Sequence, residues 1–473
     1  MRKAYFLAAT ALLGGCQLAP PHERPAAPTA SGYPAAYAGD VTLGVRATEI
    51  GWRDFFADPR LDQLVATALQ RNRDLAVSVA QIEEARGQYR IQDAERLPQL
   101  GATADATRSR VSGAQVGVPE AGSITSNRFS VGVGVTGFEL DFWGRVRNLS
   151  EAARSEYLAT VQAERAFRLT LIRDVASTYF ASREAEERIE LAEATVKSRQ
   201  DGLGLAKRRL DAGVTSALDF RQAESLLTQA ETELAGLRLA KAQSDNFLTV
   251  LVGGPIAEAL PQPLSLASQK NGTTIAAGLP SELLVARPDV LAAEERLRAA
   301  RANIGAARAA FFPSISLTGN AGFASSELDG LFSGDSFTWS FGPSISLPIF
   351  NWGALQGNLT VAKARENIQI ATYERTVQGA FQEVADALAG RRYLSDQVAA
   401  QMRAMEAQRA IANIARIRYR EGVANYLEVL DAERNLFTAE QTLIATRRSE
   451  LENLVSLYVA LGGGATEGAP PTS

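Results

Sequence analysis

A duplicated spacing of glycines is the feature that most constrains this chain. Two helical runs of 69 positions, each followed by a helical run of 40 positions, are bounded by Gly144, Gly213 and Gly253 in the first half and by Gly353, Gly422 and Gly462 in the second half. Glycine readily takes the left-handed conformation that ends a helix. The sequence therefore predicts two antiparallel helical hairpins of one size and an internal two-fold repeat.

The length of these hairpins limits the fold. A helix of 69 residues is about 100 Å long, which is several times the width of an ordinary domain. The return helix of each hairpin is shorter. A helical segment of nearly the missing length, from Asp74 to Pro98 and again from Asp289 to Pro313, precedes each pair of strands. We expect each of these short helices to stack end to end on a return helix, so that each half supplies two columns of equal height.

Two regions change from the helical period to a period of two. Apolar and small or polar residues alternate after Pro98 and again after Pro313, most clearly in Phe337-Thr338-Trp339-Ser340-Phe341. The phase slips at Gly137, which predicts a β-bulge. Strands of about ten residues with one apolar face have the length of a tilted membrane strand. The prediction is a mainly α protein with two membrane β-hairpins.

Four strands cannot close a barrel in lipid. Each unpaired backbone group in the bilayer costs several kcal/mol, so a membrane sheet cannot leave open edges. The smallest membrane barrels have about eight strands. The barrel must therefore be shared between copies of the chain, and two, three or four copies would give eight, twelve or sixteen strands.

The N-terminus has the pattern of an export signal. Arg2 and Lys3 precede a short apolar run that ends at Gly14-Gly15-Cys16, so residues 1–15 are predicted to be a signal peptide. Leu13 to Cys16 resembles a bacterial lipobox, which implies that Cys16 becomes the first mature residue and carries diacylglycerol and N-palmitoyl groups. Gln17 then implies sorting to the outer membrane. His22 lies in a Pro-rich stretch that predicts a flexible tether with a solvated histidine.

Composition argues against catalysis and against several partners. The 473 residues include one His and one Cys, which leaves no set of ligands for a Cys/His zinc site and few routes to nucleophilic catalysis. The net charge of −4 gives no reason to expect nucleic acid as a partner. Gly132, Gly134 and Gly137 satisfy G-x-G-x-x-G, but no helix opens after them as a dinucleotide site requires. We expect neither an enzyme nor a bound cofactor or metal, and we expect these glycines to let strands approach closely.

The chain resembles the TolC-type outer-membrane factors, and most closely the lipoprotein branch (OprM-like and NodT-like) of resistance-nodulation-division efflux systems. The resemblance covers nearly the whole chain and rests on Leu13 to Cys16, Asp58-Pro59 with Leu61, Asn72 with Asp74-Leu75, Glu139 to Arg145, Phe311-Phe312-Pro313, Arg418 to Gly422 and Leu427 to Ala432. It implies a homotrimer with a twelve-stranded β-barrel and a periplasmic α-barrel of twelve helices. It also implies docking on a periplasmic adaptor and an inner-membrane pump.

The resemblance implies the function as well. The chain would be a lipid-anchored outer-membrane protein that extends into the periplasm, the passive exit duct of a tripartite pump that exports drugs or other small toxic compounds from a Gram-negative cell. Two alternatives stay open: the outer-membrane component of a protein secretion system, and a periplasmic coiled-coil lipoprotein scaffold without a pore. The cargo, the particular pump and adaptor, and the open or closed resting state are not specified by the sequence.

Three groups of residues are candidates for function. The family places a periplasmic gate at positions that match Leu427, Asp431 and Arg434, whereas the first hairpin has Leu218, Gln222 and Ser225 at the equivalent positions. The family also implies adaptor docking at the hairpin tips, which comprise Gly213, Val214, Thr215, Gly422, Val423 and Ala424. Phe337, Trp339 and Phe341 are candidates for an aromatic girdle at the membrane surface.

The predicted organisation follows the repeat. The segments are the signal peptide (1–15), a lipid-anchored segment (16–60), the helices of the first repeat (61–97), the first membrane β-hairpin (98–141), the first long helical hairpin (142–254), an irregular equatorial linker (255–281), the helix of the second repeat (282–312), the second membrane β-hairpin (313–350), the second long helical hairpin (351–463) and a disordered tail (464–473).

Overall fold

The computed structural model describes residues 17–34, 36, 44–112, 114, 117, 122–257, 259–269, 275–276, 278 and 280–464. The predicted signal peptide, Cys16 and residues 465–473 of the predicted tail lie outside these residues. The fold consists of two compact units. Unit 1 is built from the described parts of Met1–Pro25, Ile82–Thr160 and Ala293–Tyr373, and unit 2 from those of Ala26–Gln81, Val161–Ala292 and Glu374–Ser473.

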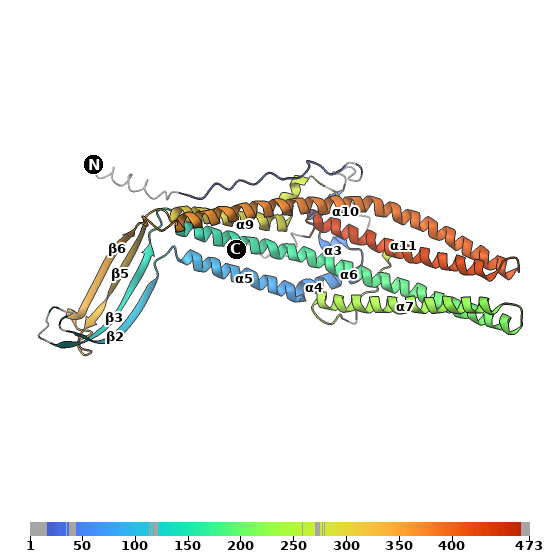
Figure 1. Cartoon of the computed structure of the whole chain (residues 1–473), viewed down its shortest axis with the longest axis horizontal. Helices are drawn as coiled ribbons and strands as arrows, with labels where there is room; N and C mark the ends of the chain where they lie inside the picture. Colours follow the sequence, from blue (N-terminus) through green and yellow to red (C-terminus); the bar gives the residue numbers. More distant parts are fainter. Residues whose placement is uncertain are drawn as a thin grey trace. The chain divides into compact units, whose positions relative to one another are not determined.

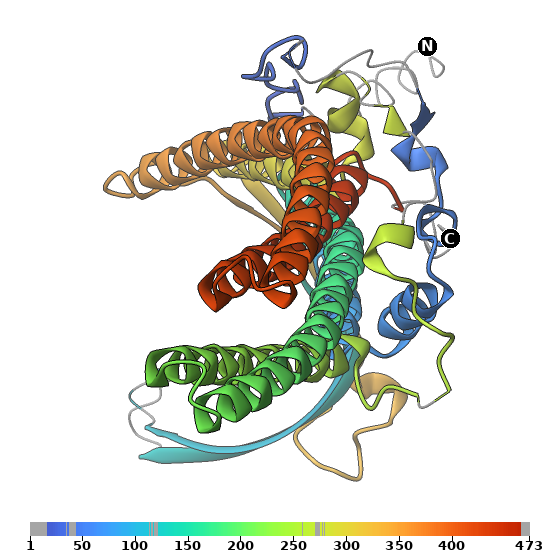
Figure 2. The same cartoon turned by 90° about the vertical axis from the view of Figure 1, so that its right-hand side faces the viewer.

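The chain is mainly helical, and its long helices form two antiparallel hairpins (Figure 1 and Figure 2). The α-helices are α3 (Trp52–Phe55), α4 (Pro59–Arg71), α5 (Arg73–Ala94), α6 (Arg145–Asp211), α7 (Ala217–Val252), α8 (Leu283–Ala286), α9 (Pro288–Ala309), α10 (Ala354–Arg420) and α11 (Tyr426–Ala460). Both α6 and α10 have 67 residues, both α5 and α9 have 22, and α7 and α11 have 36 and 35. The predicted two hairpins of one size are confirmed. No helix in the described ranges is long and apolar enough to cross a bilayer.

The short helices meet the return helices end to end in unit 2, as the spacings predict. At the first junction, between α7 and α5, the Asn72 side-chain amide donates a hydrogen bond to the Leu251 carbonyl oxygen at 2.9 Å. Gly253 ends α7 with a φ of 83°, and a Cβ there would lie 2.2 Å from the Arg71 carbonyl oxygen. The second junction, between α11 and α9, repeats this arrangement, because Arg287 donates to the Ala460 carbonyl oxygen at 3.1 Å.

Unit 1 contains one antiparallel sheet of four strands in the order β2-β3-β5-β6 (Figure 1). The strands are β2 (Leu100–Ser112), β3 (Ser123–Glu139), β5 (Ser314–Ser325) and β6 (Phe337–Ser346). The register between β3 and β5 shifts between Val135 and Phe138, where Gly137 has a φ of 68°, so the predicted bulge is confirmed. A Cβ on Gly134 would lie 2.8 Å from the Gly319 carbonyl oxygen. Gly132 and Gly134 of the G-x-G-x-x-G pattern therefore serve strand packing, and Gly137 serves the bulge.

A buried carboxylate organises the equatorial part of unit 2. Asp58, which is fully buried, caps α4 by accepting a hydrogen bond from the backbone N–H of Arg60 at 2.9 Å. The same carboxylate accepts bonds from the Tyr179 hydroxyl at 2.6 Å and the Gln269 amide at 2.7 Å. Asp58 thereby ties α4 and the linker after α7 to α6.

Candidate functional site

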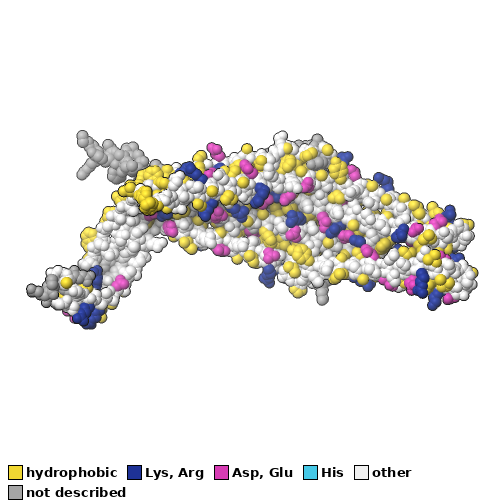
Figure 3. All heavy atoms as spheres, in the orientation of Figure 1, with side chains coloured by type: hydrophobic (Ala, Val, Ile, Leu, Met, Phe, Trp, Pro, Cys, Tyr) yellow, Lys and Arg dark blue, Asp and Glu magenta, His cyan; other side chains and the backbone are white. Residues whose placement is uncertain are grey.

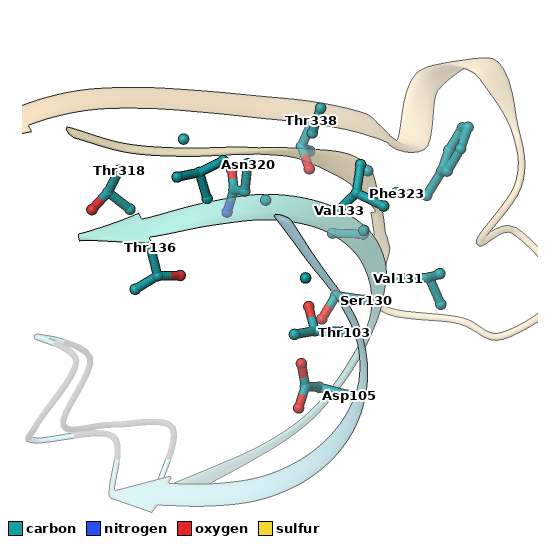
Figure 4. Close-up of a pocket in the computed structure, with 18 of the residues that line it drawn as sticks. Thr103, Asp105, Ser130, Val131, Val133, Thr136, Thr318, Asn320, Phe323 and Thr338 are labelled. Atoms are coloured by element: carbon teal, nitrogen blue, oxygen red, sulfur yellow. The ribbon is translucent and has the colours of Figure 1, made fainter. Parts of the chain in front are cut away.

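The sheet has one polar, concave face. Figure 4 shows Thr103, Asp105 and Ser130 pointing into the hollow from β2 and β3, and Thr338 lies at its rim on β6. These residues alternate with residues of the opposite face, because successive side chains in a strand point to opposite sides. Hydroxyl, amide and carboxylate groups without a fixed geometry suit water and diverse solutes rather than one ligand. The concave face can therefore line an aqueous passage.

The opposite face of the sheet carries the predicted aromatic girdle. Phe337, Trp339 and Phe341 all project from the same side of β6 and are 54%, 71% and 64% exposed. On the side of the sheet seen in Figure 3, charged side chains are sparse in the middle, and basic side chains gather at the end farthest from the helices of unit 1. Aromatic side chains next to a charged end are typical of a membrane strand. The girdle itself stays a prediction.

The first hairpin turns at Gly213, which has a φ of 73°. Val214 is 66% exposed at this tip. The return helix α7 begins with a capping box, in which Ser216 accepts from the backbone N–H of Asp219 while the Asp219 carboxylate accepts from the backbone N–H of Ser216. The hydrogen bond from the Thr215 hydroxyl, together with those from Ser216, lowers the pKa of Asp219. This tip therefore combines a fully capped helix start with an apolar side chain presented to solvent.

The second hairpin turns in the same way with a different cap. Gly422 has a φ of 77°, and Val423 is 67% exposed. Helix α11 is capped by the neutral Asn425, whose side chain accepts from the backbone N–H of Glu428 at 3.0 Å. The structure thus places all six predicted docking residues at two turns of the same design, each with one exposed valine. Docking itself stays a prediction.

The predicted gate residues lie together on α11. Asp431 and Arg434 form an ion pair of 3.1 Å, and their side chains are 51% and 58% exposed. Leu427, one turn earlier, is 49% exposed. Within one chain such an exposed pair contributes only about 0.2–1 kcal/mol. A larger stabilising contribution from Asp431 and Arg434 would therefore require further charged groups to face them.

Two contacts between the hairpin ends were not predicted from the sequence. The Arg209 guanidinium of α6 lies over the Tyr419 ring of α10, 5.0 Å from its centroid, and donates to the tyrosine hydroxyl. Gly202 of α6 leaves room for Tyr426 of α11, because a Cβ there would lie 2.7 Å from the tyrosine oxygen. Burial raises the pKa of Tyr426 to about 12. The signal available in the sequence for the second contact was Gly202 itself, a glycine in the interior of a predicted long helix.

The N-terminal segment of unit 1 corrects one prediction. His22 is exposed, as predicted, but its segment is not a free tether: the His22 Nε2 lies 3.1 Å from the Glu294 carboxylate and the Nδ1 lies 3.3 Å from the Arg301 guanidinium. Arg24 also donates to Glu294 at 2.7 Å. Partial burial lowers the pKa of His22. The prediction of a free tether was wrong because α9 carries a buried glutamate and an arginine that pair with the segment, and composition alone does not reveal such partners.

The same segment brings the chain toward the base of the sheet. Arg308, near the end of α9, donates to the Leu18 carbonyl oxygen at 2.8 Å. A Cβ on Gly305 would lie 2.8 Å from the Ala19 side chain, so the segment runs closely against α9. Arg308 precedes β5 by six residues. Leu18 is therefore held close to the point where the sheet begins, while Cys16 itself lies outside the described residues.

Paired helical hairpins and a sheet with one polar and one apolar face define a channel-forming protein of a membrane. The chain matches the family model "outer membrane efflux protein" over residues 64–254 and 279–463. It belongs to this family of efflux channels, whose members are not enzymes, and each half of the chain carries one copy of the family repeat.

Individual relatives agree with this assignment. The antibiotic efflux pump outer membrane protein ArpC of Pseudomonas putida is 44% identical over 461 residues, which cover 97% of this chain and 95% of ArpC. The cation efflux system protein CusC of Escherichia coli (strain K12) is 41% identical over 453 residues, which cover 96% of this chain and 97% of CusC. The open state of the Neisseria gonorrhoeae MtrE outer membrane channel superposes with a TM-score of 0.87 at 41% identity, over 95% of this chain and 99% of MtrE.

Proposed function

We propose that this chain is the passive exit duct of a tripartite efflux pump that moves small toxic compounds across the outer membrane. The observation that carries the proposal is the sheet, which presents a polar concave face and an apolar opposite face in a chain of the outer membrane efflux protein family. The similar proteins ArpC and CusC are named for antibiotic and cation efflux. A passage lined by small polar groups discriminates weakly among solutes, so the pump selects the cargo.

The duct is completed by other copies of the chain. Strands β2 and β6 each have one edge without a partner among the described residues. In a bilayer those edges must be paired. By the family resemblance the assembly is a homotrimer, which gives a barrel of twelve strands and a tunnel of twelve helices.

The ends of the duct carry the remaining roles. Leu427, Asp431 and Arg434 form the periplasmic gate, in which copies of the ion pair face one another around the axis of the oligomer. The tips with Val214 and Val423 dock on a periplasmic adaptor that links the duct to a resistance-nodulation-division pump of the inner membrane. Cys16 carries the lipid anchor, and the fixed position of Leu18 at the base of the sheet supports this role.

The test is made on purified protein. We expect an oligomer in mild detergent that resists SDS, shifts with heat and conducts ions in a planar bilayer. Protein that resists carbonate extraction but never conducts would support the scaffold without a pore. A monomer that conducts would contradict the shared barrel.

The cargo is tested in cells. Expression with a matching adaptor and pump, in a Gram-negative strain that lacks its own duct, should restore resistance to small toxic compounds. Restored protein secretion without restored resistance would favour the secretion alternative. Val214→Trp and Val423→Trp should abolish resistance while the oligomer still forms, and Val214→Ala and Val423→Ala serve as controls that keep a small side chain.

A further inference from the structure

One tryptophan joins the two halves of the chain at the base of the sheet. The indole N–H of Trp143 donates to the Pro313 carbonyl oxygen at 2.8 Å, and its ring stacks on Phe312 with 4.7 Å between centroids. Trp143 lies two residues before the start of α6, and Phe312-Pro313 immediately precede β5. The contact therefore fixes the angle between the end of one β-hairpin and the start of the next.

The repeat supplies a second set of the same groups, and these are not in contact. Trp352 precedes Gly353 at the start of α10, as Trp143 precedes Gly144, and Leu97-Pro98 precede β2, as Phe312-Pro313 precede β5. Trp352 is 89% exposed and Leu97 is 69% exposed. Within the described residues, the indole N–H of Trp352 has no hydrogen-bond acceptor.

The order of the strands keeps these groups apart within one chain. Leu97 and Pro98 lead into β2, Trp352 follows β6, and these two strands are the opposite edges of the four-stranded sheet (Figure 1). We infer that Trp352 docks on Leu97 and Pro98 of a second copy of this chain and reproduces between copies the contact that Trp143 makes inside one. This inference rests on the proposed homo-oligomer and names the contact that closes it.

Three observations favour a second copy as the occupant. Further exposed apolar side chains accompany both surfaces: Leu100 follows Leu97 by three residues, and the exposed Phe350 ring lies 4.7 Å from the Trp352 ring between centroids. A contact between two different surfaces of one chain is heterologous, and heterologous contacts close into rings when the rotation allows. The repeat gives this contact the same design as the internal one, so every step around the ring is alike.

The backbone of Trp352 adds a third observation. It has a φ of 55°, the only positive φ of a residue other than glycine in the described part of the chain, whereas Trp143 does not lie in this region. A left-handed conformation is sterically unfavourable for an L-residue. Docking that carries Trp352 to the backbone conformation of Trp143 would relieve this strain, and it would turn the indole toward the Pro98 carbonyl oxygen of the second copy.

Cross-linking tests the contact. Cys16, the only cysteine of the sequence, is acylated in the proposal, so a short bis-maleimide reports on introduced cysteines. In membranes, Leu97→Cys combined with Trp352→Cys should convert most of the protein into covalent oligomers that end at the closed ring. The matched control, Trp143→Cys combined with Phe312→Cys, should cross-link within one chain and leave the band at the mass of a monomer.

The outcomes separate this inference from the proposed function. An intact, conducting oligomer in which Leu97→Cys and Trp352→Cys do not cross-link would overturn the inference and leave the duct standing. Wild-type protein that forms no oligomer would overturn the duct itself.

A second variant series covers the case in which the double-cysteine protein does not fold. Trp352→Ala should lower the temperature at which the oligomer dissociates in SDS, and Trp352→Phe should lower it less, because the ring contact survives without the N–H donor. Equal dissociation temperatures for Trp352→Ala, Trp352→Phe and wild type would also count against the contact.

Discussion

The two helical hairpins share their dimensions but differ in chemistry at both ends. At the junction with the short helix, the first repeat uses the neutral Asn72 and the second uses Arg287, yet each donates to the equivalent carbonyl oxygen, of Leu251 and of Ala460. At the tips the turns match, but the exposed ion pair of Asp431 and Arg434 occurs in the second hairpin alone, where the first has Gln222 and Ser225.

This difference separates what the architecture requires from what it permits. Equal helix lengths and glycine turns keep both hairpins the same height, which a wall of parallel helices needs. Donors at the junction satisfy backbone carbonyls that the helix end leaves without partners. The first hairpin also has an exposed ion pair near its tip, between Arg221 and Glu224 at 2.6 Å, one residue before the positions equivalent to Asp431 and Arg434. The two hairpins therefore differ in which face of the return helix carries the charges, and this difference points to function.

The gate charges should give the largest effect on conductance. Replacing both Asp431 and Arg434 by Ala removes the charges that we expect to hold the tunnel closed, and the open fraction in planar bilayers should rise roughly tenfold, which corresponds to ~1.4 kcal/mol. Gln222→Ala with Ser225→Ala, at the equivalent positions of the first hairpin, is the matched control and should change nothing. Equal conductance of the two double variants would show that the hairpins do not differ in this role.

The junctions should differ in stability. Arg287→Ala removes the donor to Ala460 and leaves the carboxylates of Asp289 and Glu383, which lie 2.7 Å from the guanidinium, without their partner. Hydrogen bonds to charged groups contribute ~1.5–3 kcal/mol, so we expect a loss of about 3 kcal/mol in the free energy of unfolding.

Asn72→Ala is the counterpart in the first repeat. It removes one donor and the side-chain oxygen that accepts from the Leu75 N–H at 2.8 Å, and should cost about 1–2 kcal/mol. Chemical denaturation of the detergent-solubilised protein measures both variants. Equal losses would mean that the added charge of Arg287 contributes nothing to the second junction.

A larger residue at Gly390 should have an intermediate effect on stability. Gly390 faces Asn453 in the second hairpin, and a Cβ there would lie 2.0 Å from the Asn453 side-chain oxygen. The first hairpin has Ala181 and Ser244 at the equivalent positions. Gly390→Ala should destabilise by about 1–2 kcal/mol, because the overlap outweighs the gain of roughly 1 kcal/mol from replacing glycine in a helix.

The compensating change tests that explanation. Adding Asn453→Ser to Gly390→Ala recreates the pair of the first hairpin and should recover most of the lost thermal stability. A double variant as unstable as Gly390→Ala would show that the two hairpins pack differently at this level.

As the pH falls, the helix start at the first tip should lose stability at a slightly higher pH than the helix start at the second tip. The folded pKa of Asp219 lies below its ordinary value, so its carboxylate stabilises the tip above the unfolded pKa, and this contribution is lost as the pH falls through the folded pKa. Asp219→Asn should speed hydrogen exchange at the start of α7 by about twofold near neutral pH. The second tip, capped by the neutral Asn425, is the internal control and should show no such change.

Much of the fold could be predicted because the spacing of glycines and the period of apolar residues indicate helices, strands and turns. The spacing of Gly213 and Gly422 fixed the hairpins, the alternation around Trp339 fixed a strand, and the phase slip at Gly137 fixed a bulge. The positions of candidate site residues at the two turns followed from the same spacings. Partners across the fold could not be predicted in this way. His22 was expected to lie on a free tether but pairs with Glu294, and the packing of Tyr426 against Gly202 was not expected from the sequence.

The sequence by itself determined the lengths, the order and the duplication of the elements, because hydrogen bonds within helices and between adjacent strands depend on residues near one another in the chain. Only the tertiary structure decided which distant residues meet, such as Arg209 with Tyr419 and Trp143 with Pro313, and which equivalents, such as Trp352, are left exposed. Such contacts depend on how long helices and strand edges are placed in space. That placement is a property of the packed chain as a whole, and no local pattern of residues encodes it.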